Sequence, residues 1–173
     1  VREIIIQGKV ISTFRNLEEQ AKKDDKIKFN KVYRSDCIQF MKSLDEASID
    51  LTVTSPPYDE LRNYNGYSFD FENIAKQLFR ITKKGVVVVW VVGDKIKKGN
   101  KSLTSFRQAL FFQEVGFNMH DVMIYRKKNT PFMRSNAYTN CFEFMFVLSK
   151  GSPKTFNPLR VKTVRQGQEK LPF

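Results

Sequence analysis

The chain has 173 residues, 41% of them hydrophobic and 13% aromatic, which predicts one folded domain and excludes a chain that is disordered throughout. No stretch approaches the roughly 18 consecutive apolar residues of a membrane span, so we expect a soluble protein. Two cysteines and a single histidine support neither a disulfide framework nor a zinc site, and they favour the reducing cytoplasm. The net charge is +12, and residues 126–173 hold ten Lys or Arg against two acids, which gives 10 − 2 = +8 for that part. This charge favours a polyanionic partner, above all nucleic acid, over a basic surface that only contacts solvent.

The N-terminal part predicts helices and strands in alternation. Residues 1–30 are expected to form an N-terminal helical segment, with a charged helix over residues 12–26. Residues 31–36, KVYRSD, predict a short strand. Residues 36–48 predict a helix, and its apolar residues fall at helical spacing: Ile38, Met41 and Leu44. The β-branched run IDLTVT at 49–54 predicts a further strand.

The middle of the chain has the clearest patterns. Residues 70–82 predict a helix with one apolar stripe, formed by Phe71, Ile74, Ala75, Leu78 and Phe79. Lys83-Lys84-Gly85 is expected to supply its basic last turn and its end. The run VVVVWVV at 86–92 is apolar on both faces, which is typical of a central strand covered on two sides in a parallel sheet.

The second half predicts a helix followed by two strands. Residues 103–115 are expected to be helical, capped by Ser102 and ended by Gly116. Residues 121–128 and 141–150 read as strands that pair as an antiparallel hairpin at a sheet edge. The order of all these elements predicts a three-layer α/β domain with a mostly parallel sheet.

The strand at 49–54 ends on Ser55-Pro56-Pro57-Tyr58. In open α/β sheets ligands bind outside the carboxyl ends of the strands, so these residues form a candidate site. Two prolines fix the backbone and offer no N–H, so the turn presents carbonyl acceptors, and Ser55 Oγ can accept as well. The Tyr58 ring adds a flat face for stacking. An exocyclic amino group on a planar heterocycle would meet all these features, whereas the simpler interpretation is a strand terminator.

TSPPY at 54–58 resembles the catalytic motif, (Asp/Asn/Ser)-Pro-Pro-(Tyr/Phe), of the amino-methyltransferases that act on DNA bases. The resemblance continues through SDCIQFMKSLDEASIDLTVTSPPY, FENIAKQLFRITKKGVVVVWVVGD and the pair HDVMIYRK and CFEFMFVLSKG, and it covers roughly residues 31–158. We take these residues as the catalytic part of the domain, followed by a basic tail over 159–173. The resemblance implies a Rossmann-like sheet with an antiparallel edge hairpin, S-adenosylmethionine as methyl donor, and double-stranded DNA from which the target base is flipped.

The resemblance also implies roles for single residues. Ser55 and the Pro56 carbonyl would accept hydrogen bonds from the target amine, in the rigid turn that Pro57 completes, and Tyr58 would stack on the flipped base. The amine lone pair would attack in line, so catalysis rests on positioning and electrostatics.

Cofactor and DNA contacts are expected at further positions. Asp36, with the backbone at Cys37, matches the family position that meets the adenine of the cofactor; its alternative role is the N-cap of the helix that follows, and both roles are compatible. Lys127, Lys128 and Arg134 are expected to contact DNA phosphates, and a loop exposed to solvent is the alternative.

One family feature is missing from the sequence. The family needs a Gly-rich turn of the Phe-x-Gly-x-Gly kind for the cofactor's methionine end, and the eight glycines here contain no Gly-x-Gly. In the order with the catalytic motif first, this turn follows the target-recognition region. We therefore expect the front part of a permuted methyltransferase, or one half of a split enzyme whose complementing chain, or homodimer partner, supplies the turn. Alone, it is expected to bind S-adenosylmethionine poorly.

The leading Ser55 favours the N4 amine of cytosine as the target, and the N6 amine of adenine is the alternative. Related Asn-Pro-Pro-Tyr sites methylate protein glutamine or RNA, but Ser55 and the basic later segment favour DNA. A DNA-binding module without catalysis is the remaining alternative.

Overall fold

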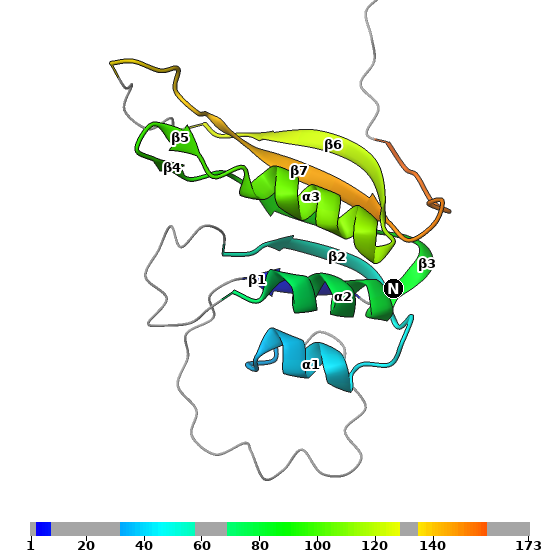
Figure 1. The fold of residues 1–173 in the computed structure, drawn as a ribbon. Coiled ribbons are helices and arrows are strands. Elements are labelled where there is room, and N and C mark those ends of the chain that lie inside the picture. The colour runs from blue at the N-terminus through cyan, green and yellow to red at the C-terminus, as the bar shows by residue number, and fades with distance from the viewer. Residues whose placement is uncertain (1–2, 8–31, 58–68, 129–134, 159–173) are drawn as a thin grey trace, which may run out of the picture.

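The computed structural model describes residues 3–7, 32–57, 69–128 and 135–158 (Figure 1). The helices in these ranges are α1 (Cys37–Ser43), α2 (Phe71–Ile81) and α3 (Thr104–Val115). The strands are β1 (Glu3–Gln7), β2 (Ile49–Ser55), β3 (Thr82–Val92), β4 (Ile96–Lys97), β5 (Asn100–Lys101), β6 (Asn118–Arg126) and β7 (Phe142–Ser149).

Five strands form one mixed sheet in the order β1-β2-β3-β7-β6. β1, β2 and β3 are parallel, whereas β7 is antiparallel to both β3 and β6. β4 and β5 form a separate small hairpin. The expected α/β sheet, with 86–92 at its centre and an antiparallel hairpin at its edge, is therefore confirmed.

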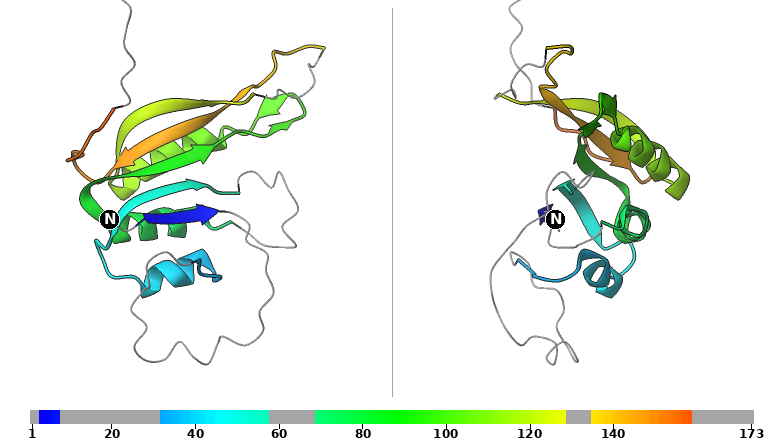
Figure 2. Two further views of the ribbon diagram at one scale, coloured as in Figure 1. Left: turned by 180° about the vertical axis from the view of Figure 1, so that it is seen from behind. Right: turned by 60° about the vertical axis from the view of Figure 1, so that its left-hand side comes forward.

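The three helices lie on the same face of the sheet (Figures 1 and 2). On β3 this face carries Val88, Trp90 and Val92, which are fully buried. The opposite face of β3 carries Val87, Val89 and Val91, which are only partly buried. The described elements thus make two layers, one of helices and one of strands. A third layer was expected because residues 86–92 are apolar on both faces, and it stays a prediction.

The core between α2, α3 and the sheet is rich in aromatic rings. The Trp90 ring lies against Phe71 and Phe112 with ring centroids 5.8 and 5.0 Å away. Its indole Nε1 donates to Gln108 Oε1 at 2.8 Å, so the buried N–H is satisfied. The apolar stripe predicted for residues 70–82 faces this core, and Ile74, Ala75 and Leu78 are its fully buried members.

Two predictions for the N-terminal part are wrong. Residues 32–36 form no strand, because β1 occupies the position beside β2 and a strand needs a neighbouring backbone to pair with. Residues 3–7 of the expected helical segment 1–30 are a strand instead of a helix. The helix expected over residues 12–26 lies outside the described residues.

Lys83-Lys84-Gly85 does not end α2 either, because these residues belong to β3. α2 ends at Ile81, and its C-cap is Thr82, whose backbone N–H and hydroxyl both donate to the Leu78 carbonyl. Gly85 has φ +85°, and the register between β2 and β3 shifts around it, so this glycine bends the start of the strand. Helix and strand follow each other without a loop.

Candidate functional site

Ser55 is the last residue of β2, at the carboxyl end of a strand that lies between two parallel neighbours. Its side chain is exposed, whereas Pro56 is buried and Pro57 is partly buried. The prolines are therefore anchored in the protein while the serine hydroxyl faces outward, as an acceptor site at a strand end requires. Tyr58 lies outside the described residues.

The starts of the helices lie at this same end of the sheet. Because α1 precedes β2, α2 precedes β3 and α3 follows β3, each helix begins near the carboxyl ends of the parallel strands (Figure 1). This end, the carboxyl edge, is where open α/β sheets bind ligands. Asp36, Ser55 and Asp94 all lie on it.

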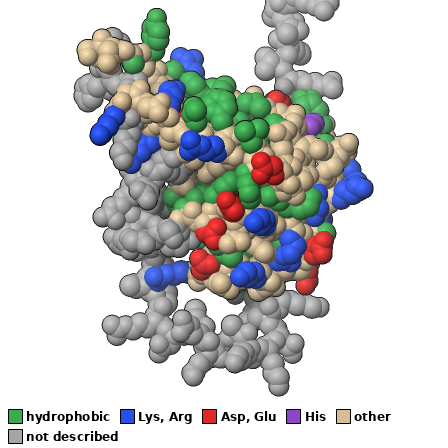
Figure 3. Space-filling view, viewed as in Figure 1, with side chains coloured by type: hydrophobic (Ala, Val, Ile, Leu, Met, Phe, Trp, Pro, Cys, Tyr) green, Lys and Arg blue, Asp and Glu red, His purple; other side chains and the backbone are tan. Residues whose placement is uncertain are grey.

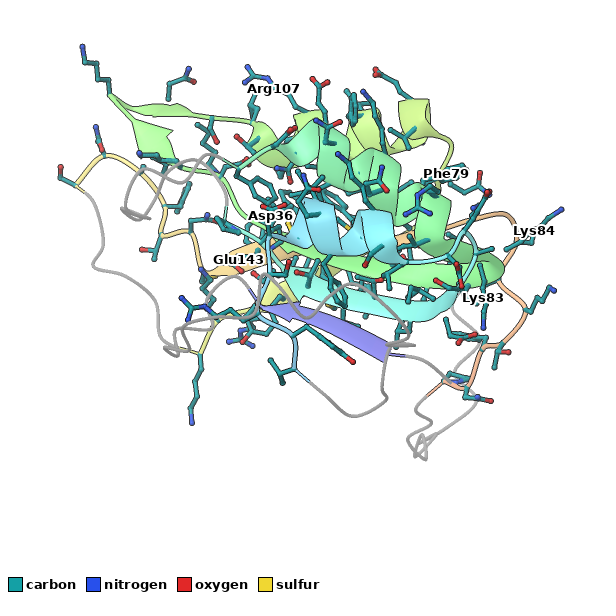
Figure 4. The ribbon with its side chains drawn as sticks, turned by 90° about the horizontal axis from the view of Figure 1, so that it is seen from below. Asp36, Phe79, Lys83, Lys84, Arg107 and Glu143 are labelled. Atoms are coloured by element: carbon teal, nitrogen blue, oxygen red, sulfur yellow. The ribbon has the colours of Figure 1, made fainter. Side chains whose placement is uncertain are left out.

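Asp36 is the N-cap residue of α1. Its Oδ1 accepts from the Gln39 backbone N–H at 2.9 Å, so the predicted capping role is confirmed. The residue is exposed at the start of α1, at the end of the sheet opposite Lys83 (Figure 4). The Tyr33 and Phe40 rings contact each other beside it, with centroids 5.0 Å apart and planes tilted by 32°. The role of Asp36 and Cys37 in cofactor binding stays a prediction.

Asp94 caps α3 together with Ser102, the residue that the sequence predicted as the cap. Asp94 Oδ1 accepts from the Ser105 backbone N–H at 2.9 Å, and Oδ2 accepts from Ser105 Oγ at 2.8 Å. Leu103, the residue before α3, has φ +55° and makes no side-chain cap. Ser102 Oγ accepts from the Lys95 backbone N–H at 3.2 Å and from the Thr104 backbone N–H, at the first residue of α3, at 3.4 Å. The carboxylate therefore supports the carboxyl edge by fixing α3, which sequence reasoning missed because the cap comes from a preceding loop.

The candidate DNA-binding residues follow β6. The Lys127 backbone N–H donates to the Cys141 carbonyl at 2.7 Å, and its Nζ forms an ion pair with Glu143 of β7. Lys128 is exposed, and Arg134 lies outside the described residues. Lys127 is thus held beside the carboxyl edge by β7. Glu143 was not predicted, because only the register of the hairpin brings the two residues together.

A mixed sheet with a Ser-Pro-Pro turn at the carboxyl end of a parallel strand is a Rossmann-like arrangement with a candidate ligand site at that edge. Residues 49–171 match the family N6_N4_Mtase, described as DNA methylase. This match covers more than half of the chain, so the chain belongs to that family and the resemblance seen in TSPPY is confirmed. Among the described residues, no helix is long and apolar enough to cross a membrane.

Named relatives agree with this assignment. The chain is 61% identical over 117 residues to the orphan methyltransferase M.BamHII of Bacillus amyloliquefaciens, an alignment that covers 68% of this chain and 44% of the relative. It is 29% identical over 164 residues to the type II methyltransferase M.MthZI of Methanothermobacter thermautotrophicus, covering 73% and 46%. The chain therefore spans less than half the length of these relatives.

Solved structures show the same fold. The PvuII DNA methyltransferase, cytosine-N4-specific, superposes with a TM-score of 0.60 at 22% identity, covering 79% of this chain and 58% of that one. A putative DNA modification methylase from Thermus thermophilus gives a TM-score of 0.53 at 22% identity in complex with S-adenosyl-L-methionine, covering 71% and 55%.

Proposed function

We propose that this chain carries the target-amine site of a DNA methyltransferase that transfers a methyl group from S-adenosylmethionine to the N4 amine of a flipped cytosine. The observation that supports it most is the exposed Ser55 on a buried Pro-Pro turn, at the carboxyl end of β2, in a member of the DNA methylase family. Double-stranded DNA is the substrate that this family and the basic charge favour.

The chemistry at this turn is positioning. Ser55 Oγ and the Pro56 carbonyl accept hydrogen bonds from the two N–H groups of the target amine, which holds the nitrogen in place and draws its lone pair out of the ring. The cofactor supplies an electrophilic methyl group; a nitrogen–carbon bond forms as the carbon–sulfur bond breaks, and the amine then loses a proton. Tyr58 is proposed to stack on the flipped base. No general base is needed to deprotonate the amine before the attack, so the rate enhancement comes mainly from positioning and electrostatics.

Cytosine is favoured over adenine because of the serine. We associate Ser in the first position of the motif with cytosine-N4 enzymes and Asp with adenine enzymes. The PvuII enzyme, whose fold this chain shares, is itself cytosine-N4-specific. Adenine N6 is the second candidate target.

The chain contains residues that fit the adenine end of the cofactor but lacks the turn for its methionine end. Asp36, exposed on the carboxyl edge beside the Tyr33 and Phe40 rings, fits the adenine end, because a carboxylate accepts from an adenine amino group. The sequence has no Gly-x-Gly for the methionine end. We propose that polypeptide outside these 173 residues supplies that turn, as a further segment or a complementing chain. The face of β3 with Val87, Val89 and Val91, which no described helix covers, is available to it.

Methylation by this chain, completed with the polypeptide that supplies the turn, tests the proposal. Mass spectrometry of the nucleosides after incubation with duplex DNA should detect N4-methylcytosine. Ser55→Ala should lower the rate by about 10²–10³-fold, because it removes one acceptor aimed at the amine, and should retain DNA binding. Ser152→Ala, at an exposed serine in the turn after β7, is the matched control and should not change the rate.

Four results would contradict parts of this proposal. N6-methyladenine as the product would make adenine the target, and an unchanged rate in Ser55→Ala would remove the role of the hydroxyl. DNA binding without methylation, even with a complete cofactor site, would identify a binding module. Isothermal titration of S-adenosylmethionine into the 173 residues alone should show poor binding, and tight binding would refute the divided cofactor site.

A further inference from the structure

β6 is an apolar strand at the edge of the sheet. It is the last strand in the sheet order, with β7 on one side and no described strand on the other. Eight of its nine residues are exposed. Four consecutive ones are large and apolar: Val122, Met123, Ile124 and Tyr125, with exposed fractions of 50, 47, 52 and 52%. Long apolar edges of this kind pair readily with another strand, and proteins usually protect them with Lys, Pro or a short strand.

The free edge of β6 has a defined set of backbone groups. The Val122 N–H donates to its neighbour's carboxylate, Asp121 Oδ1, at 2.8 Å, so this N–H is not given to β7. Backbone groups of successive residues in a strand point to opposite sides. The N–H and C=O groups of Val122, Ile124 and Arg126 therefore point away from β7, toward a possible partner strand.

An exposed apolar stripe begins just before α3 and continues along it, on the helix-covered face of the sheet. Leu103, Phe106 and Leu110, at spacings of three and four residues, have exposed fractions of 46, 51 and 60%. Phe106 contacts Phe144 of β7 with ring centroids 5.4 Å apart, and Phe144 pairs with Ile124 across the hairpin. Paired residues point to the same face of a sheet. Ile124, and likewise Val122, thus lies on the α3 side.

These five residues form one surface, which we call the β6–α3 surface: Leu103, Phe106, Leu110, Val122 and Ile124. Figure 3 shows hydrophobic side chains gathered over β6 and α3. Large apolar surfaces on a protein usually mark an interaction site. A partner for this surface must supply both a strand edge and apolar side chains on the α3 side.

We propose that the partner is a second copy of this chain, paired antiparallel through β6. The two copies are related by a two-fold axis perpendicular to the sheet, so the helix-covered faces of both copies are on the same side of the joined sheet. Both α3 helices then lie over the junction of the two β6 strands, which we call the seam, and the apolar stripe of each helix covers that of the other. An added peptide strand would pair with the edge but leave the α3 stripe exposed.

The charges near β6 also fit a copy of the same strand. With Ile124 opposite Ile124, Met123 lies opposite Tyr125, and Asp121 lies opposite Lys127 at both ends of the seam. Asp121 joins Glu143 as a second carboxylate for the Lys127 ammonium. Opposite charges across a strand pair stabilise it.

This dimer is independent of the proposed methyl transfer. Because the two β6 strands are antiparallel, the carboxyl edges of the two copies lie at opposite ends of the joined sheet. Each Ser55 therefore stays open to its own DNA, and neither copy completes the other's site.

Sedimentation equilibrium of the full chain over a range of concentrations tests the proposal. The wild type should dimerise, and Ile124→Lys and Leu110→Lys should each weaken the dimer at least tenfold, because each buries a charge at the seam. Val32→Lys, at an exposed apolar residue before α1, should leave the dimer unchanged. Leu110 is exposed on a helix, so its variant should keep the wild-type circular dichroism spectrum and melting temperature.

A wild type that stays monomeric at all concentrations would overturn the proposal. So would a dimer that persists unchanged in both seam variants, since the contact would then lie elsewhere. Methylation by an all-monomeric protein would leave the proposed function intact while removing this interface.

Discussion

Arg80 ties two helices together through a single guanidinium group. Its Nη1 donates to the Leu44 carbonyl at 2.9 Å and its Nη2 to the Met41 carbonyl, while Nε donates to Gln77 Oε1 at 2.9 Å. These carbonyls are at the end of α1, where a helix lacks internal donors for its last backbone oxygens. Arg80 therefore fixes the helix that carries Asp36 at its other end.

Arg80→Ala should lower the free energy of unfolding by about 2 kcal/mol, because partly buried carbonyls lose a charged donor. Urea denaturation followed by circular dichroism measures this. Lys76→Ala on the same helix removes an exposed ion pair with Glu72, 3.9 Å long, and the contact of the ammonium with the Phe111 ring, 5.8 Å from its centroid, and should change stability by less than about 1 kcal/mol. Equal effects of the two substitutions would show that the end of α1 does not depend on Arg80.

At the scale of elements, α2 begins at a carboxylate whose titration should affect stability. Asp70 Oδ1 accepts from the Asn73 backbone N–H, and Oδ2 accepts from the Asn73 side-chain amide at 2.6 Å. The side-chain bond, followed by the backbone bond, lowers the pKa of Asp70 below its ordinary value of 3.8. The folded state therefore favours the charged form.

Asp70→Ala should lower the melting temperature at neutral pH, and this deficit should shrink as the pH falls. The sign follows from the lowered pKa: the stabilisation is present above the unfolded pKa and is lost as the pH falls through the folded pKa. Melting curves between pH 7 and pH 3 measure the difference. Asp70→Asn, which keeps one N-cap acceptor but has no charge, is the control and should show a smaller deficit at pH 7 than Asp70→Ala, because it loses only the ionic part. A deficit in Asp70→Ala that is constant with pH would contradict the ionic contribution.

The sequence predicted the elements that have a strong pattern of their own. The stripe of α2 and the run at 86–92 fold as expected because each has its own hydrophobic period. Residues 31–36 also have a strand-like composition, but it is residues 3–7 that pair with β2. The local sequence of a segment does not show which of two such segments will pair with a given strand. The end of α2 was misplaced for a related reason, because the bend at Gly85 depends on its alignment with β2.

The candidate site was predicted where its chemistry is local. Ser55-Pro56-Pro57 lies at the end of one strand, so its position on the carboxyl edge followed from strand order. The Asp94 cap and the Lys127–Glu143 pair join residues 11 and 16 positions apart, and only the folded loops and the hairpin register bring them together.

At the scale of the whole molecule, exposed lysines lie at both ends of the sheet. The net charge is +12, and Lys127 and Lys128 follow β6 beside the carboxyl edge, where the proposed target amine would enter. Lys84 is exposed at the start of β3, at the opposite end of the sheet (Figure 4). A comparison of Lys128 with Lys84 therefore distinguishes a phosphate contact at the carboxyl edge from the long-range attraction of DNA by the net positive charge of the protein.

DNA affinity measured by fluorescence anisotropy across a series of salt concentrations should distinguish these contributions. Each phosphate contact releases counterions, so the logarithm of the association constant should fall linearly with the logarithm of the salt concentration. Lys128→Ala should reduce that slope by about 1, because it removes one proposed phosphate contact. Lys84→Ala removes the same charge far from the carboxyl edge and should leave the slope nearly unchanged. Equal slopes in the two variants would mean that DNA responds to the total charge of the protein and that Lys128 does not contact a phosphate at the site.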